Sequence, residues 1–156
     1  MSLQFRYNAT VLKTNLSGVS NEQSLCSSEH GPNCLNWIVG HIVNSRDGFL
    51  QVLNQDLTWT NGEGKMYGQG ADFDPTNPAF SLEELMALYS TAGKRIRDGL
   101  EAFDLARLSE PAPFGVGPGD PGTLAKLFPS LIWHETYHTG QTGVVRRTLG
   151  LEGAIK

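Results

Sequence analysis

The sequence has little positive charge and no long apolar run. Lys and Arg total 12 against 16 Asp and Glu, and the formal net charge is −4. A nucleic-acid-binding surface needs clustered positive charge, so this balance argues against a nucleic-acid partner. The densest apolar stretch, residues 35–43, is interrupted by polar residues and glycine and is too short to cross a bilayer. We therefore expect no nucleic-acid partner and no membrane association.

Cysteine and targeting signals are also scarce. Cys26 and Cys34 are the two cysteines of the chain, and residues 1–11 contain no apolar signal-peptide core. In a reducing compartment, two cysteines are more often free thiols than a disulfide. We expect a cytoplasmic protein in which both thiols are free.

Strand signals are missing, and helical signals take their place. No turn dipeptide separates two alternating apolar runs, whereas apolar residues recur at three- and four-residue steps over 3–16, about 33–54, 82–103 and 124–149. In the first of these segments, the expected apolar face consists of Leu3, Tyr7, Val11 and Thr14. The sequence therefore predicts an all-α four-helix bundle that forms a single domain over residues 1–156.

Capping and breaking residues mark where the predicted helices begin. Ser20 with Gln23, and Ser81 with Glu84, have capping-box spacing, which predicts a short helical turn and the start of the third segment. Asn33 and Thr123 are the predicted N-caps of the second and fourth segments. Residues 61–78 and 111–122 are rich in glycine and proline and predict long loops on either side of the third helix. The first of these loops is expected to cover the mouth of the site described next.

Two histidines fall on the core-facing seam of the last predicted helix. The apolar positions of this helix alternate between three- and four-residue steps, and the same steps continued from Leu131 lead to His134, His138 and Gln141. The two histidines are one turn apart, so both rings can reach one ion. Because buried imidazoles without partners are costly, this pair predicts a metal site.

A third ligand is expected from the second predicted helix. His41 lies in the middle of that helix, whereas His30 lies in a break rich in glycine and proline. Three neutral imidazoles on two helices leave coordination positions open, as catalytic metal sites require. The predicted ligands of a divalent metal are His41, His134 and His138, and the residues expected to line a pocket beside it are Trp37, Asn44, Tyr137 and Gln141.

Residues 134–138 also match H-E-x-x-H, the zinc-protease motif in which the glutamate is the general base. No histidine follows His138, Glu152 lies in a glycine-flanked tail, and the strands that such proteases use to hold a peptide are not predicted. We therefore disfavour a protease. Glu135 stays a candidate catalytic residue, because a carboxylate beside a metal-bound water can accept its proton.

Three motifs together resemble the DinB-like metalloprotein superfamily. They are Trp-x-x-Gly-His at 37–41, Ser-Leu-Glu-Glu-Leu at 81–85, and His-x-x-x-His-x-Gly-Gln at 134–141. The resemblance covers nearly the whole chain. It implies an up-down-down-up four-helix bundle and a divalent metal, commonly zinc or nickel, on His41, His134 and His138.

The resemblance also implies a reaction class. Characterised members of the superfamily include thiol-dependent S-transferases and a thiol-dependent isomerase, and dimers are common. We therefore expect a homodimeric, metal-dependent transferase that takes a small-molecule substrate and a low-molecular-weight thiol, the thiol being activated on the open metal position. Two alternatives stay open, namely a metal-dependent hydrolase and a non-catalytic metal-binding stress protein.

Two residues inside the predicted helices are poor helix formers. Gly40 costs about 1 kcal/mol in a helix interior, which suggests that it lets another helix approach closely. Pro129 is expected to kink the early part of the last helix and to alter the pocket.

Overall fold

The computed structural model describes residues 2–26, 33–116 and 119–155. Its elements are α1 (Ser2–Leu16), α2 (Asn21–Leu25), α3 (Leu35–Val52), η1 (Glu63–Tyr67), α4 (Leu82–Glu101), η2 (Leu105–Ser109) and α5 (Leu124–Thr148), of which η1 and η2 are 3₁₀ helices. The described ranges contain no strand, and an isolated bridge joins Pro111 and Thr123. The all-α prediction is therefore confirmed. None of these helices is long and apolar enough to cross a membrane.

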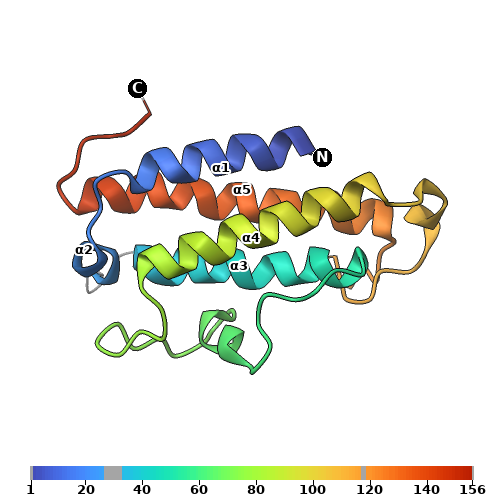
Figure 1. Ribbon diagram of the computed structural model, residues 1–156, viewed down its shortest axis with the longest axis horizontal. Coiled ribbons are helices and arrows are strands. Elements are labelled where there is room, and N and C mark those ends of the chain that lie inside the picture. The colour runs from blue at the N-terminus through green and yellow to red at the C-terminus, as the bar shows by residue number, and fades with distance from the viewer. Residues whose placement is uncertain (1, 27–32, 117–118, 156) are drawn as a thin grey trace.

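The four long helices run in two parallel pairs. α1 and α5 lie side by side and run in one direction, and α3 and α4 run in the other (Figure 1). α3 also packs against α5, so these two helices face each other inside the bundle. The resulting order is up-down-down-up. The connection that contains η1 passes along the outer side of α3, and η2 lies at the end of the bundle where α5 begins (Figure 1).

The helix starts follow the sequence signals in part. Both predicted capping boxes form, at Ser20 and at Ser81. The predicted N-cap Asn33 is wrong, because α3 is capped by the extended residue Cys34 without a side-chain hydrogen bond. Thr123 is the N-cap of α5 but makes no side-chain cap bond, and α5 continues through Pro129. Residues 63–67 were predicted to be part of an irregular loop, but they form η1.

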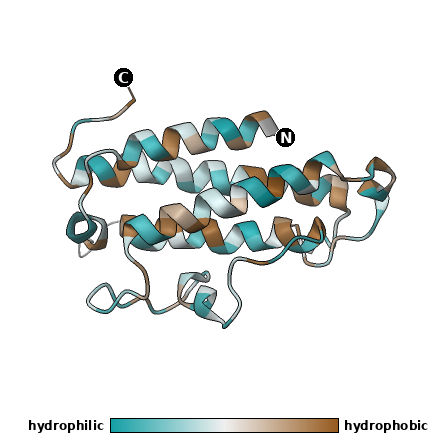
Figure 2. Ribbon diagram, in the orientation of Figure 1, coloured by the Kyte–Doolittle hydropathy of each residue, from teal (hydrophilic) through white to brown (hydrophobic). Residues whose placement is uncertain are grey.

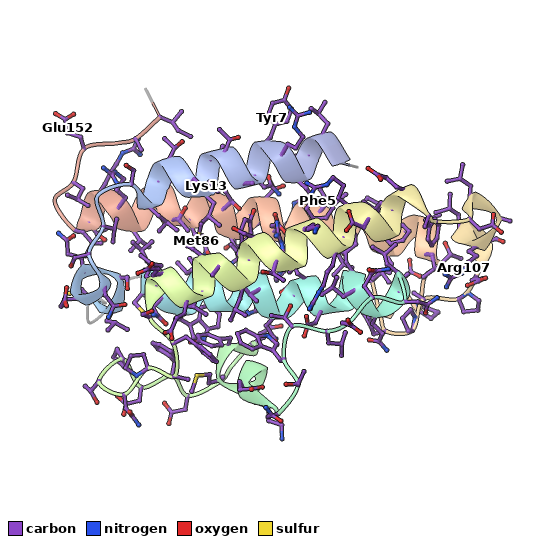
Figure 3. All side chains as sticks on the ribbon, in the orientation of Figure 1. Phe5, Tyr7, Lys13, Met86, Arg107 and Glu152 are labelled. Carbon is purple, nitrogen blue, oxygen red and sulfur yellow. The ribbon has the colours of Figure 1, made fainter. Side chains whose placement is uncertain are left out.

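The apolar face predicted for α1 is wrong. Leu3 and Tyr7 are 54% and 59% exposed, and the buried face carries Phe5, Asn8, Leu12, Asn15 and Leu16. Figure 3 shows Tyr7 directed away from the bundle. The pattern misleads because two core positions are asparagines that hydrogen-bond to α5, to Glu135 at 3.4 Å and to Thr142 at 3.0 Å.

Apolar side chains elsewhere form two clusters along the bundle. One contains Leu35, Ile38, Ile42 and Leu85, and the other contains Phe49, Ile96, Leu127 and Phe128. Hydrophobic and hydrophilic residues alternate along each long helix, as Figure 2 shows. Because each fully buried Leu, Ile or Phe contributes roughly 1.5–3 kcal/mol, these clusters hold the helices in place around the polar groups between them.

One buried polar network joins all four long helices. Arg46 on α3 donates two hydrogen bonds to Glu135 on α5, both at 2.9 Å, and both side chains are 3% exposed. The Tyr89 hydroxyl of α4 donates to the same carboxylate at 3.3 Å, and Asn8 of α1 donates at 3.4 Å. The Arg46 guanidinium also lies over the Tyr89 ring, 3.5 Å from its centroid. A buried ion pair is retained only when its remaining hydrogen-bonding capacity is met, and this network meets it.

Candidate metal centre

Three histidine side chains converge between α3 and α5. The Nε2 atom of His134 lies 3.2 Å from His41 Nε2 and 3.2 Å from His138 Nε2. One ligand atom from each of the three residues falls within 4.8 Å of the others. Residues far apart in the chain thus place three imidazole nitrogens around one point.

The neighbours of two rings determine which nitrogen carries the hydrogen. His41 Nδ1 lies 2.6 Å from the backbone carbonyl oxygen of Tyr67, and His138 Nδ1 lies 2.7 Å from Gln141 Oε1. Because these oxygens only accept, both Nδ1 atoms are the donors. The Gln141 amide is oriented in turn by donating to the Tyr137 hydroxyl at 3.3 Å. The Nε2 atoms of His41 and His138 therefore carry lone pairs directed at the common point.

This arrangement fits a divalent cation. His134 Nε2 has at most one hydrogen, so it can donate to His41 Nε2 or to His138 Nε2 but not to both. Without a cation, at least one of these two contacts would bring the lone pairs of two nitrogen atoms together. Nitrogen ligands at about 2.0–2.1 Å from a tetrahedral ion lie roughly 3.3 Å apart, close to the separations found here. Imidazole nitrogens suit zinc and nickel among the common divalent metals.

Burial keeps the three rings neutral. Desolvation lowers the pKa of His41 and of His134, and it lowers the pKa of His138 to about 4. A charge on His41 lowers the pKa of the other two rings further, whereas the hydrogen bond from His138 to Gln141 acts in the opposite direction. At neutral pH the site therefore presents lone pairs, which is the form that binds a metal.

Comparisons with known proteins identify the family of the chain. The model of the DinB superfamily matches residues 4–142, a span that contains all three histidines. The chain belongs to the DinB superfamily. A crystal structure of a conserved protein from Enterococcus faecalis matches with a TM-score of 0.74 at 15% identity, over 95% of this chain and 94% of that chain. At that identity the match shows the fold alone, and the search of curated proteins found no match.

The two aromatic residues predicted to line the pocket of this DinB protein occupy different environments. Trp37 is buried and stacks on His41, with ring centroids 4.6 Å apart, so it supports the ligand from behind. Tyr137 is 53% exposed and contacts the edge of His138. Trp37 thus fixes a ring from inside, and Tyr137 lies at the outer rim.

The two polar residues predicted for the pocket have different contacts: Gln141 bonds to a histidine ring, and Asn44 lines a cavity. Gln141 holds His138, as described above. Asn44 is half-buried and lines a cavity that His134 also lines. The predicted pocket residues therefore divide into supports for the rings and one cavity residue.

Gly40 permits a close approach, as predicted, but the element that approaches is the short 3₁₀ helix η1 and not one of the long helices. A Cβ atom at this position would lie 2.1 Å from Tyr67 Cδ1, so the missing side chain makes room for the Tyr67 ring. Tyr67 is fully buried, and its carbonyl oxygen is the one that orients His41. The connection between α3 and α4 thus reaches His41 through η1, and a cover over the mouth of the site stays a prediction.

Glu135 lies beside a candidate ligand in the sequence, but its partners belong to the buried network. Both of its carboxylate oxygens accept hydrogen bonds from Arg46, and one also accepts from Tyr89 and Asn8. A general base needs a free oxygen within hydrogen-bond reach of its proton. These contacts favour a structural role.

His30, the histidine not predicted as a ligand, lies outside the described residues.

Sequence reasoning missed two residues that organise this centre. Arg46 lies four residues after Ile42 and three residues before Phe49, so it occupies a core-facing position of the helix. A cationic side chain at such a position indicates a buried anionic partner, which here is Glu135. Tyr67 had no such signal, because it acts through a backbone carbonyl that any residue carries. Only the path of the connection in space brings that carbonyl to His41.

Proposed function

We propose that this protein is a metal-dependent enzyme of the thiol S-transferase type, with zinc or nickel held by His41, His134 and His138. The observation that carries the proposal is the convergence of three neutral imidazoles whose Nε2 atoms lie at ligand spacing. A small-molecule substrate and a low-molecular-weight thiol are its reactants. The cytoplasmic location and the homodimer stay predictions of the sequence and of the resemblance.

The chain's own residues hold the site in a reactive arrangement. Tyr67 and Gln141 fix the tautomers of two ligands, and such outer partners orient the rings and raise their basicity. A divalent ion held there supplies a Lewis acid that lowers the pKa of a thiol or water. The Trp37 and Tyr137 rings flank the ligands and limit access of solvent to them.

The contacts of Glu135 favour thiol chemistry over hydrolysis. Metal-assisted hydrolysis uses a general base to take the proton of the attacking water. The carboxylate next to His134 is engaged by Arg46 instead. A thiol needs less help from a base, because its pKa is already near 8.5 before any metal lowers it.

The number of ligands favours a catalytic site over a structural one. Structural zinc sites are closed by four protein ligands, and catalytic sites keep a position open. The candidate group contains three histidines and, within the described ranges, no cysteine or carboxylate. A non-catalytic metal-binding protein is thus the weaker alternative.

The direct test is a thiol-dependence screen with defined metal content. The purified protein is loaded with zinc or nickel, and a panel of small thiols is assayed with an activated aryl halide as the model electrophile. We expect product formation that requires both metal and thiol and that disappears in His134→Ala. Metal-dependent ester hydrolysis without any thiol effect would favour the hydrolase instead.

A further inference from the structure

A cavity of about 310 Å³ lies beside the candidate metal centre. It is open to solvent on one side and is bordered by α3, by α5 and by the connection that precedes α5. The lining residues are Asn44, Ser45, Gly48, Phe114, Gly115, Ser130, Leu131 and His134. His134 lines the cavity and is also a candidate metal ligand, so the cavity adjoins the metal centre. Its volume falls at the lower end of the range of small-molecule sites, about 300–1,000 Å³.

None of the residues that line this cavity is charged. Proteins recognise carboxylates and phosphates mainly with Arg and Lys. The nearest acidic residue on α3, Asp47, accepts hydrogen bonds from the backbone of Thr58 and Trp59 at 2.8 and 3.2 Å. Apart from an ion held at His134, an ionised group in the cavity would thus gain no counter-charge for the water that it loses, which is unfavourable.

The polar groups of the cavity are few and specific. The Ser45 hydroxyl donates to the His41 carbonyl oxygen at 2.9 Å, and the Ser130 hydroxyl donates to the Val116 carbonyl oxygen at 3.2 Å. Their hydrogens are therefore used, and they offer a ligand only acceptor lone pairs. The Asn44 side chain makes no hydrogen bond to the described residues, and its Oδ1 atom lies against Gly64. Its amide NH₂ group is thus available to donate to an oxygen atom of a ligand.

An apolar wall faces these groups. Phe114 and Leu131 supply it, and Phe114 is 36% exposed, so part of its ring is free to contact a ligand. A Cβ atom at Gly48 would lie 3.0 Å from Phe114 Cζ and 3.7 Å from Leu131 Cδ2. Gly48 therefore lets the Phe114 ring lie against α3.

We propose that this cavity binds the substrate of the metal centre, and that this substrate is an uncharged small molecule with a ring-sized apolar body and an acceptor oxygen that faces Asn44. The proposal rests on the proposed function in placing the reacting end of the molecule at His134. The preference for an uncharged body follows from the lining alone.

A matched pair of probes tests the charge preference. Phenylmethanethiols with a para-carboxamide or a para-carboxylate have the same size and the same sulfur, and differ in charge. Each is titrated into isotope-labelled protein in its metal-free and its zinc-loaded form while the backbone amide signals of Gly48 and Gly115 are followed by NMR. In the metal-free protein, where no ion contributes a charge, we expect the carboxamide to bind at least about tenfold more tightly, because the carboxylate loses water without gaining a partner. Equal affinities, or shifts confined to other residues, would overturn the proposal.

Two variants and one control locate the binding. Phe114→Ala and Asn44→Leu should each raise the dissociation constant of the carboxamide by roughly tenfold, because they remove the apolar wall and the amide donor. Leu105→Ala, at a residue that is 69% exposed and not among those lining the cavity, should leave it unchanged. Unchanged binding in both cavity variants would contradict the proposal. The amide spectra of the variants show whether each is folded.

The comparison of the metal-free and the zinc-loaded titration separates this inference from the proposed function. If zinc does not bind, the proposed function fails, and the contrast between the two probes at Gly48 and Gly115 still decides the charge preference. If zinc binds and the probes do not differ, the inference fails and the metal-dependent function stands.

Discussion

His41 Nε2 lies 3.2 Å from His134 Nε2, although 93 residues separate them in the chain. The contact exists because α3 and α5 pack against each other, with the two histidines on their facing sides. It brings two neutral imidazoles to the separation that ligands of one ion adopt.

Removing any one of the three rings should release the metal. His41→Ala, His134→Ala and His138→Ala each leave two ligands, which hold an ion weakly. Metal analysis after dialysis should therefore find little metal in any of the three variants. His30→Ala, in which the predicted ligands are intact, is the control and should keep its metal. Stoichiometric metal in the His41 variant would sink the ligand assignment.

Gln141 should tune the affinity without being a ligand. Gln141→Leu removes the acceptor of the His138 Nδ1 hydrogen, and loss of such a partner typically lowers metal affinity by about 10–100-fold. Gln141→Glu keeps an acceptor oxygen and should retain the affinity. Competition titrations with a chromophoric chelator measure both variants. Equal affinities in the two would show that the hydrogen bond has no such effect.

Glu135→Gln tests whether this residue is structural or catalytic. The variant leaves Arg46 buried without its counter-charge, and breaking a buried pair costs about 3–5 kcal/mol. Urea unfolding should show this loss, and the double variant Arg46→Met with Glu135→Leu should recover most of it. A variant with unchanged stability, bound metal and a turnover lowered by ~10²–10⁴-fold would instead identify a general base.

Gly40 and Gly140 form a matched pair of helix glycines. Ala at Gly40 would collide with the buried Tyr67 ring, so Gly40→Ala should destabilise the fold by about 1–3 kcal/mol and weaken metal binding by moving the Tyr67 carbonyl. Gly140 has open space around its Cα, and Gly140→Ala should stabilise the protein by up to about 1 kcal/mol. Thermal unfolding of both variants checks the contrast. A Gly40→Ala protein as stable as Gly140→Ala would refute the close packing of Tyr67.

The metal-free protein should lose stability as the pH falls from 6.5 towards 4. In this window the unfolded His138 binds a proton that the folded residue, with its pKa lowered to about 4, does not bind. The unfolded state therefore binds more protons, and the free energy of unfolding decreases as the pH drops. His138→Gln should remove part of this dependence in chemical denaturation series. A slope that is the same in both proteins would contradict the neutral, buried ring.

The sequence predicted the fold better than the details of the site. The helices with strong apolar periodicity and capping boxes, such as α4 after Ser81, were predicted closely because local signals define them. The face of α1 was wrong because Asn8 and Asn15 occupy core positions, where a hydropathy pattern cannot recognise them. His134 and His138 were predicted from their spacing and His41 from its position in mid-helix, but the carbonyl of Tyr67 depends on the path of a loop in space.

The measurement that tests the central claim most directly is X-ray absorption spectroscopy of the zinc-loaded protein. The account predicts one ion per chain whose protein ligands are three imidazole nitrogens at about 2.0–2.1 Å. Addition of a small thiol should then place one sulfur at about 2.3 Å in the open position. A protein that holds no zinc, or a shell with protein sulfur or fewer than three imidazoles, would contradict it.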